Sequence, residues 1–342
     1  MSFHIENNSL IKYIEDSSEA DIAIPDGIKS INDKAFAGCA SICSVVIPDS
    51  VECIGNKAFA DCISLKKVQL PKSLDYIGEK CFQGSGITEL TIPSGTKMMR
   101  WAAFRMCPDL ETIHIENGVK CLVDCCFEQN PKLHEVYIPE SVADIGEHTF
   151  MNDANITLVV QKGSYAEKYA EQSGIRYRYT DSVKVVVVSD SHGNYRNFSE
   201  IVKRHKDSEY IIHAGDGERD IEDLEMYERD LAKKVVFVGG NCDIHGAHVR
   251  DKVVEIGGIR IFVAHGDRYE VKTDKTVIAK VAKEEDCQAA IFGHSHIRYC
   301  ETVDDVYLLN PGSCEIQGDK TPPSYALMYI GHGHICSEIM EV

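Results

Sequence analysis

The segment SVVIPDSVECIGNKAFADC, residues 44–62, recurs with variations along the first half of the chain. Its aliphatic residue at position 47 has counterparts at 24, 70, 92, 115 and 138, so the successive steps are 23, 23, 22, 23 and 23 residues. A phenylalanine recurs in the same register, at positions 36, 59, 82, 104, 127 and 150. One repeat of this length cannot bury its own apolar face, so the period predicts a stack whose neighbouring repeats share a continuous core.

A period between 20 and 29 residues is typical of leucine-rich repeats. Each repeat here offers one short strand, such as Ser44–Ile47, followed by a turn whose phenylalanine we expect inside the stack. Small residues occupy another shared register, where such repeats place a polar ladder: Cys39, Cys62, Cys107 and Asn130. The pattern over residues 20–160 resembles the BspA-like class of bacterial leucine-rich repeats. It predicts an N-terminal leucine-rich-repeat solenoid.

The stretch KGSYAEKYA, residues 162–170, has helical character and resembles the cap that ends such an array. A cap is needed because the apolar end of the last repeat would otherwise face water. We therefore expect residues 1–180 to form a leucine-rich-repeat domain with a terminal cap.

Both the period and the composition change near residue 182. The run Val183–Val188 is almost continuously apolar, as expected of a strand that is buried on both faces. Strands and helices then alternate and strands alone follow, which predicts an α/β sandwich over residues 183–342. The expected strands are 210–213, 234–238, a hairpin at 253–264, 289–292, 307–309 and 325–329, and the expected helices are 194–205 and 273–285.

The charge and the cysteines limit the classes of partner. The chain has a formal net charge of −18, and each half lacks the clustered lysine and arginine that a nucleic-acid backbone requires. The first residues do not resemble a secretory signal, and no stretch approaches the roughly 18 apolar residues of a membrane span. We therefore expect the 14 cysteines to be free thiols of a cytoplasmic protein that has no membrane or nucleic-acid partner.

Five short motifs carry the candidate chemistry of the second half, and each follows an apolar run. They are Asp190-Ser191-His192-Gly193-Asn194, Gly215-Asp216, Gly240-Asn241-Cys242-Asp243, His265-Gly266-Asp267 and Gly293-His294-Ser295-His296. Ligands gather at the carboxyl ends of strands in layered α/β folds, so we expect the five loops to converge. Within Asp190-x-His192 and His294-x-His296, alternate residues leaving a strand would point to the same side. Such oxygen and nitrogen ligands suit Mn, Fe, Zn or Ni.

The five motifs, in this order, resemble those of the calcineurin-like metallophosphoesterase superfamily, and most closely its small bacterial and archaeal phosphodiesterase branch. The resemblance implies a sandwich of the four-layer type and two divalent metal ions, with Mn favoured and Ni, Co, Fe or Zn as alternatives. It assigns Asp190, His192 and His296 to one metal. Asn241, His265 and His294 go to the other metal, and Asp216 bridges the two. The same seven residues are the expected catalytic residues.

The expected activity is metal-dependent hydrolysis of a small phosphate ester, with phosphodiesters favoured. A pair of metals roughly 3.5–4 Å apart can bind a phosphoryl oxygen and stabilise an in-line displacement. Two alternatives remain: a phosphoprotein phosphatase directed by the repeats, and a non-catalytic scaffold of the same fold, against which the complete ligand set argues. Cys242 stands where much of the superfamily has histidine, and a thiol is a poor substitute as a proton donor, so we expect Cys242 to be a bystander.

Other polar residues near the motifs leave alternatives open. Arg219 could contact phosphate or be a solvated loop residue. His213 could support the site or simply pack within its strand, and His245 and His248 could line the substrate cleft. The segment His332-Gly333-His334 is expected to be a hairpin turn rather than a metal site.

The repeats are expected to bind a protein partner or to recruit substrate, because stacked repeats offer extended surfaces. Only residues 177–182 separate the expected cap from the first strand of the second domain. At about 3.3–3.6 Å per residue this tether reaches roughly 20 Å, which would allow the strand face to lie near the metal cleft. Independent tethered domains are the alternative.

Overall fold

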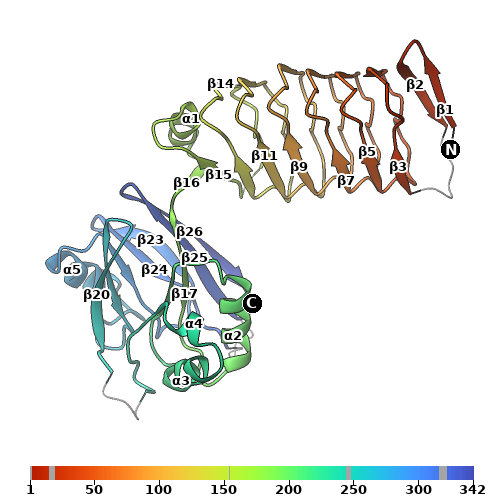
Figure 1. Cartoon of the computed structure of the whole chain (residues 1–342). Helices are drawn as coiled ribbons and strands as arrows, with labels where there is room; N and C mark the ends of the chain where they lie inside the picture. The colour runs from red at the N-terminus through yellow and green to blue at the C-terminus, as the bar shows by residue number, and fades with distance from the viewer. Residues whose placement is uncertain (1, 15–19, 154, 244–247, 316–321) are drawn as a thin grey trace. The chain divides into compact units, whose positions relative to one another are not determined.

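The computed structural model describes residues 2–14, 20–153, 155–243, 248–315 and 322–342. Internal contacts divide the chain into two compact units, Met1–Thr180 and Asp181–Val342 (Figure 1). No helix of the described residues is long and apolar enough to cross a membrane. The two-unit layout expected from the change of period is therefore present.

The N-terminal unit stacks one short parallel strand per repeat along one face (Figure 1). The first three form a sheet of β3 (Asp21–Ala23), β5 (Ser44–Val46) and β7 (Lys67–Gln69). The next sheet contains β9 (Glu89–Ile92), β11 (Thr112–Ile115), β13 (Glu135–Tyr137), β15 (Thr157–Val160) and β16 (Arg176–Tyr179). The ladder is interrupted between β7 and β9, where the repeat is 22 residues long instead of 23. The described strands thus form separate sheets, not the single continuous ladder expected of a solenoid.

A second set of strands, mostly of two residues each, forms the opposite face. A hairpin of β1 (Ser2–Glu6) and β2 (Ser9–Ile14) begins a sheet that continues through β4 (Ser30–Ile31), β6 (Cys53–Ile54), β8 (Tyr76–Ile77) and β10 (Met98–Met99). A separate pair follows, β12 (Cys121–Leu122) and β14 (Asp144–Ile145). The sequence analysis missed the N-terminal hairpin, which lies before the first full repeat.

The repeated phenylalanines stack through the interior of this unit. Adjacent rings have centroids 4.7 Å apart for Phe36 and Phe59 and 5.9 Å apart for Phe127 and Phe150. Tyr13 of β2 continues the stack, with its ring 5.1 Å from Phe36, so the hairpin closes the N-terminal end. The core of this unit is therefore the row of rings expected from the 23-residue period.

The cysteine register is the expected buried ladder. The thiol of Cys62 donates to the carbonyl of Phe36 at 3.1 Å, and Cys107 donates to the carbonyl of Phe82 at 3.3 Å. In the next repeat Asn130 takes over, because its amide donates to the carbonyl of Phe127 at 2.5 Å. All 14 cysteines are free thiols.

Helix α1 (Tyr165–Ser173) ends the stack, with Ser164 accepting the N–H of Glu167 as its N-cap and Gly174 in a left-handed conformation at its C-terminus. Strand β16 follows and pairs with β15. The expected tether 177–182 is therefore wrong in its extent, because Tyr177–Tyr179 belong to the last strand of the sheet. Only residues 180–182 lie between β16 and the first strand of the second unit.

Two five-stranded sheets make up the C-terminal unit. The first has the order β19-β18-β17-β25-β26, from β17 (Val183–Val188), β18 (Tyr210–His213), β19 (Val235–Phe237), β25 (Ser324–Gly331) and β26 (His334–Glu341). The second has the order β20-β21-β22-β24-β23, from β20 (Asp251–Ile256), β21 (Ile259–Ala264), β22 (Ala289–Ile291), β23 (Tyr299–Val303) and β24 (Val306–Asn310). Antiparallel strand β23 was not expected from the sequence, and β26 was expected only as the strand that follows the turn at residues 332–334.

The valine run of β17 shows why its residues are apolar on both faces. Val185 and Val187 pack into the core shared by the two sheets, whereas Val186 and Val188 face α2 (Tyr195–Arg204). Helix α3 (Glu218–Tyr227) and the short α4 (Arg229–Ala232) contribute to the same outer core. Helix α5 (Thr276–Glu284) packs against the second sheet. The first sheet therefore packs against α2, α3 and α4, and the second packs against α5. Helices α3 and α4 were not expected from the sequence.

Candidate metal centre

The candidate residues lie on five loops, each of which leaves the carboxyl end of a strand. Parallel strands β17, β18 and β19 lead to Asp190, Asp216 and Asn241, and parallel strands β21 and β22 lead to His265 and His294. Backbone hydrogen bonds join neighbouring loops, for example from the N–H of Asp190 to the carbonyl of Gly215 at 3.0 Å. Within each sheet the loops meet because parallel strands end at the same edge. The contact of 2.9 Å between Nδ1 of His265 and the carbonyl of Ala214 joins the loops of the two sheets.

Left-handed turns, rather than extended strand ends, place these side chains. Five of the seven candidate residues have φ between 48° and 62°: Asp190, His192, Asp216, His294 and His296. Residues other than glycine rarely adopt this conformation, and each instance costs about 1–3 kcal/mol unless the surroundings impose it. The strand alternation expected within Asp190-x-His192 and His294-x-His296 is therefore wrong as the reason for their convergence. Tight turns give each pair its orientation.

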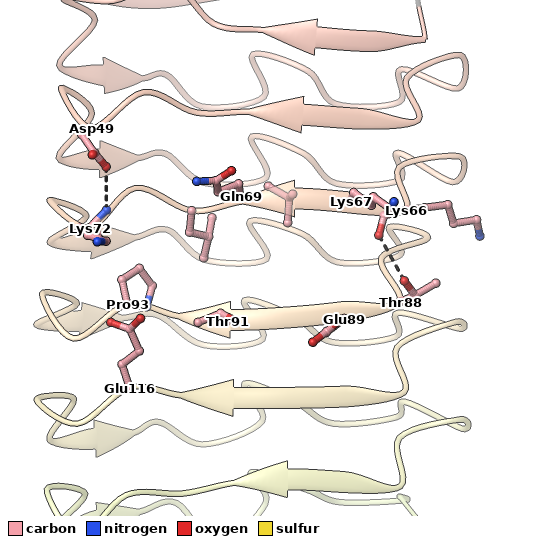
Figure 2. Close-up of a pocket in the computed structure, with 12 residues that line it drawn as sticks. Asp49, Lys66, Lys67, Gln69, Lys72, Thr88, Glu89, Thr91, Pro93 and Glu116 are labelled. Atoms are coloured by element: carbon pink, nitrogen blue, oxygen red, sulfur yellow. Dashed lines mark hydrogen bonds between the residues drawn. The ribbon is translucent and has the colours of Figure 1, made fainter. Parts of the chain in front are cut away.

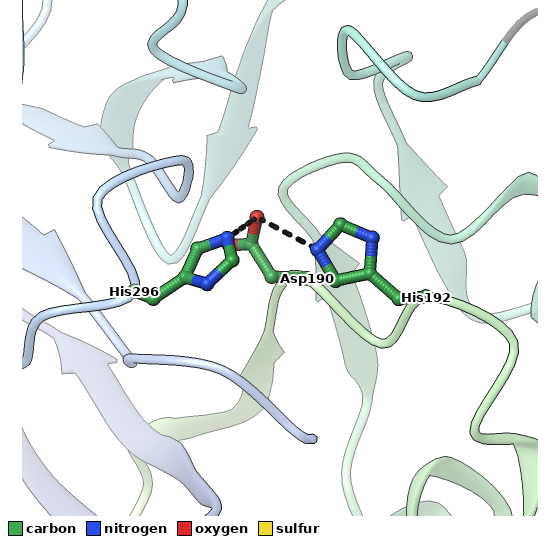
Figure 3. Close-up of side chains that lie close together, drawn as sticks. All are labelled: Asp190, His192 and His296. Atoms are coloured by element: carbon green, nitrogen blue, oxygen red, sulfur yellow. Dashed lines mark ion pairs between the residues drawn. The ribbon is translucent and has the colours of Figure 1, made fainter. Parts of the chain in front are cut away.

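Asp190 lies at the centre of the first group (Figure 3). Its Oδ1 atom is 3.0 Å from Nε2 of His296 and 3.9 Å from Nε2 of His192. Its Oδ2 atom accepts the hydroxyl of Ser189 at 2.6 Å and the backbone N–H of His294 at 3.1 Å. Asp190 is fully buried, and its Oδ1 accepts no hydrogen bond from the described residues although the imidazoles surround it.

His265 lies at the centre of the second group and is also fully buried. Its Nδ1 lies 2.9 Å from the carbonyl of Ala214, which can only accept, so the proton of neutral His265 is on Nδ1. The unprotonated Nε2 then faces Oδ2 of Asp216 and Oδ1 of Asn241, each 3.2 Å away. Oδ2 of Asp216 also lies 4.0 Å from Nε2 of His192, so this carboxylate touches both groups.

The charges in the groups around Asp190 and His265 favour the binding of a cation. Burial raises the pKa of Asp216, but the His265 imidazole and the backbone N–H of Cys242 outweigh it and hold that pKa well below its usual range. Burial lowers the pKa of His265, but Asp216 and Asp190 outweigh it and raise that pKa. A buried carboxylate oxygen without a hydrogen bond and an imidazole nitrogen that faces oxygen atoms fit a divalent cation.

Three clusters of potential ligands occur among the described residues: Asp190, His192 and His296; Asp190, Asp216 and His265; His192, Asp216 and Cys242. Asn241 and His294 belong to none of these three clusters, but both lie beside His265. Oδ1 of Asn241 is 3.2 Å from Nε2 of His265, and the centre of the His294 ring is 5.1 Å from that of the His265 ring. Burial, with Lys272 and His265, lowers the pKa of His294. The structure thus brings the seven candidate residues to one place and adds Cys242, whose pKa burial and Asp216 raise to about 11.

Asp243 is a supporting residue whose role the sequence analysis missed. Its carboxylate accepts three backbone N–H groups, from Asp216 at 2.8 Å, Gly240 at 2.7 Å and Glu218 at 2.9 Å. It therefore fixes two of the loops to each other. The motif that contains Asp243 was recognised from the sequence, but its distant backbone partners carry no sequence signal.

Arg250 supports the loops from another side and was also missed. Its guanidinium donates to the carbonyl of Gly240 at 2.8 Å and to Asp267 at 2.5 Å. The loop that carries Asn241 is thereby tied to the loop that carries His265. Asp267 stands in a recognised motif, whereas nothing in the sequence around Arg250 indicates this contact.

The structure decides between the alternatives left open for His213. His213 is fully buried in β18, and its Nε2 lies 3.0 Å from the hydroxyl of Ser191, which donates to Asp220. It is a packed strand residue whose hydrogen-bond contact with the loops of the site, among the described residues, is with Ser191. The segment His332-Gly333-His334 is the expected hairpin turn between β25 and β26.

A hollow of about 240 Å³ opens beside His192, Asp216 and Cys242, and Arg219 lines it. His248 pairs with Glu218 of the same hollow through a contact of 2.8 Å between Nε2 and Oε1. His245 lies outside the described residues.

Comparison with known proteins gives two family matches. The calcineurin-like phosphoesterase superfamily domain matches residues 183–333. The BspA type leucine rich repeat region matches residues 15–157 in six copies. The two matches follow one another along the chain without overlap.

Similar proteins cover the C-terminal unit. A probable metallophosphoesterase of Mycoplasma pneumoniae is 31% identical over 156 residues, which are 44% of this chain and 92% of that protein. A probable metallophosphoesterase of Bacillus subtilis is 32% identical, over 43% of this chain and 83% of that protein. A phosphodiesterase of Methanocaldococcus jannaschii is 28% identical, over 39% of this chain and 84% of that protein.

Proposed function

Since the chain belongs, through residues 183–333, to the calcineurin-like phosphoesterase superfamily, we propose that its C-terminal unit is a dinuclear phosphodiesterase. The two family matches confirm both resemblances expected from the sequence, to this superfamily and to BspA-type repeats. The enzyme class is a metal-dependent hydrolase of phosphoric esters.

We assign one divalent cation to Asp190, His192 and His296 and another to Asn241, His265 and His294, with Asp216 shared. The observation that carries this assignment is the position of Asp216, whose Oδ2 faces His265 on one side and His192 on the other. When bound, the cations would supply Lewis-acid polarisation of a phosphoryl oxygen and activation of water. Mixed carboxylate, amide and imidazole donors favour Mn, with Ni, Co, Fe or Zn as alternatives.

The chain's own residues prepare the site for this chemistry. The carbonyl of Ala214 holds the His265 ring in the tautomer that directs Nε2 inward. Ser189 and the N–H of His294 saturate one oxygen of Asp190 and leave the other to face the imidazoles. Because these partners fix the donors before any ligand binds, little reorganisation is needed.

A diester is the favoured substrate because a similar protein of Methanocaldococcus jannaschii is named a phosphodiesterase. The alternatives are a phosphoprotein phosphatase directed by the repeats and a non-catalytic scaffold. The complete set of candidate ligands argues against the scaffold. We further propose that the two sheets and their helices form a four-layer sandwich and that the protein acts in the cytoplasm.

The repeats are proposed to bind a protein partner through their strand face. A hollow of about 630 Å³ lies on that face at the interruption between β7 and β9 (Figure 2). Its lining is mostly polar and carries both charges, including Lys67, Gln69, Glu89 and Thr91. A surface of mixed polarity suits a transient protein contact.

The test is an activity panel on the purified full chain over diesters, monoesters and phosphopeptides, after chelation and after return of single metals. We expect no turnover after chelation, and the best recovery with Mn on a small activated diester. Turnover in a rigorously metal-free sample would refute the metal-dependent mechanism. Faster turnover of phosphopeptides would favour the phosphatase alternative.

A further inference from the structure

Arg219 occupies a distinct position beside the candidate metal centre. It is the one arginine of α3 (Glu218–Tyr227) and lines the hollow of about 240 Å³ that His192, Asp216 and Cys242 also line. Among the described residues, Arg219 is the only lysine or arginine of that hollow. The hollow is thus lined both by a cluster of potential metal ligands and by one positively charged side chain, Arg219.

The acidic side chains of the hollow already have partners. Both oxygens of Asp243 accept backbone N–H groups, and Glu218 pairs with His248 at 2.8 Å. Arg219, by contrast, is exposed and forms no hydrogen bond or ion pair with any residue that the structure describes. As far as the described residues are concerned, its five N–H donors are therefore available to a ligand.

The negative net charge of the chain makes the positive charge of Arg219 important for the binding of an anion. A protein of net charge −18 repels phosphate esters, so a substrate anion needs local positive charge to approach the loops. Guanidinium groups bind phosphate oxygens through two parallel N–H donors, which gives both affinity and orientation. The volume admits a phosphate with a small alcohol.

We propose that Arg219 binds a non-bridging oxygen of the substrate's phosphate group and holds it against the metal centre. The proposal rests on the proposed function, because it takes the hollow to be the place where a phosphate ester binds. It gives Arg219 a substrate contact that the seven candidate ligands do not provide. Arg219 would bind inorganic phosphate as well as the ester.

The experiment measures binding of inorganic phosphate by calorimetry to the Mn-loaded full chain, without turnover. We expect Arg219→Ala to raise the Kd for phosphate about ten- to a hundredfold, as for loss of a charge-assisted hydrogen bond. Arg219→Lys keeps the charge but not the paired donors, so it should recover only part of the affinity. The matched control is Arg229→Ala, since Arg229 is also exposed but begins α4, beyond the far end of α3.

The Mn content of each variant is measured in parallel, and we expect Arg219→Ala to retain the metal because Arg219 is not a candidate ligand. An Arg219→Ala variant that binds phosphate as tightly as the unaltered chain would overturn the proposal. An equal loss in Arg229→Ala would overturn it too, because the effect would then be one of general charge. If the unaltered chain binds phosphate through Arg219 but hydrolyses no ester, the proposed function fails while the binding site stands.

Discussion

The carboxylate of Asp243 accepts the backbone N–H of Asp216 at 2.8 Å, although the two residues stand on different loops. The same oxygen accepts the N–H of Gly240 at 2.7 Å. Asp216 is 3% exposed and adopts a φ of 57°, a conformation that its surroundings must impose. Asp243 therefore fixes the backbone of Asp216, whose carboxylate lies between the two candidate ligand groups.

Replacing Asp243 by Ala leaves three backbone N–H groups without their acceptor. We expect metal affinity to fall about ten- to a hundredfold, the usual effect of losing a partner that orients a ligand. Calorimetric titration of the metal-free protein with Mn measures this directly. Asp243→Asn retains one carbonyl oxygen and should lose less. Equal affinity in all three proteins would show that the loop holds Asp216 without Asp243.

Asp216→Asn and His294→Ala should each lower kcat/KM for a small activated diester about a hundredfold or more while leaving the fold intact. Asp216 faces both groups, so its loss affects both proposed metals, and His294 borders His265. Kinetics at saturating Mn, with circular dichroism for the fold, test the pair. His334→Ala, in the β25–β26 hairpin, is the control. Unaltered rates in a metal-loaded variant would remove that residue from the assignment.

The sequence predicted the parts of the fold that depend on periodicity. The 23-residue spacing placed Phe36, Phe59 and their successors in one stack, and the register of Cys62 predicted a buried ladder. Residue types at strand ends likewise identified Asp190 and His265. The stack and the ladder can be recognised in the sequence because the same contact recurs in every repeat. The candidate ligands can be recognised because aspartate and histidine are residue types that bind metals.

Other features depend on contacts between distant residues and could not be predicted in this way. The left-handed turn at Asp190 and the link from Arg250 to Asp267 arise only once separate loops meet. The tether was overestimated because β16, with the sequence RYRY, has no apolar run and pairs as a strand only against β15. Helix α3 is equally hard to recognise, since its sequence ERDIEDLEMY is largely acidic.

Stability of the N-terminal unit should depend on pH through Asp153, which ends the polar ladder at the register of Asn130. Burial raises the pKa of Asp153 to about 8, and Glu128 adds to the rise against the hydrogen bond from Asn130. The folded state therefore favours the protonated carboxyl. Its contribution to stability is fully present below the unfolded pKa near 4 and is lost as pH rises towards 8.

Asp153→Asn should remove this loss of stability, because an amide does not ionise. The amide of Asn130, at the equivalent position of the preceding repeat, already forms a buried hydrogen bond. We expect the variant to be more stable than the parent by about 1–3 kcal/mol at pH 8 and little changed at pH 4. Thermal melts across this range measure the difference. Asp26→Asn, at an exposed position, is the control for loss of one negative charge. A pH-independent difference between Asp153→Asn and the parent would contradict the prediction.

The last prediction concerns the use of the repeats. We expect residues 1–180 and 183–342 to fold when expressed separately, because each unit has its own core. All seven candidate ligands lie in the second piece, so it should hydrolyse a small activated diester at the rate of the full chain. If the repeats recruit substrate, their removal should impair only a macromolecular phosphoester. A well-folded but inactive second piece would show instead that the repeats complete the site.

A charge reversal in the intact chain locates the recruiting surface. Lys67 lines the hollow between β7 and β9, whereas Lys120 is an exposed lysine of the same unit that does not line it. If a partner or substrate binds in the hollow, Lys67→Glu should raise KM for the macromolecular substrate several-fold and leave the small diester unchanged. Lys120→Glu should change neither, because Lys120 does not line the hollow. Equal effects of both reversals would assign recruitment to the overall charge of the unit, and no effect of either would leave the hollow without a role in recruitment.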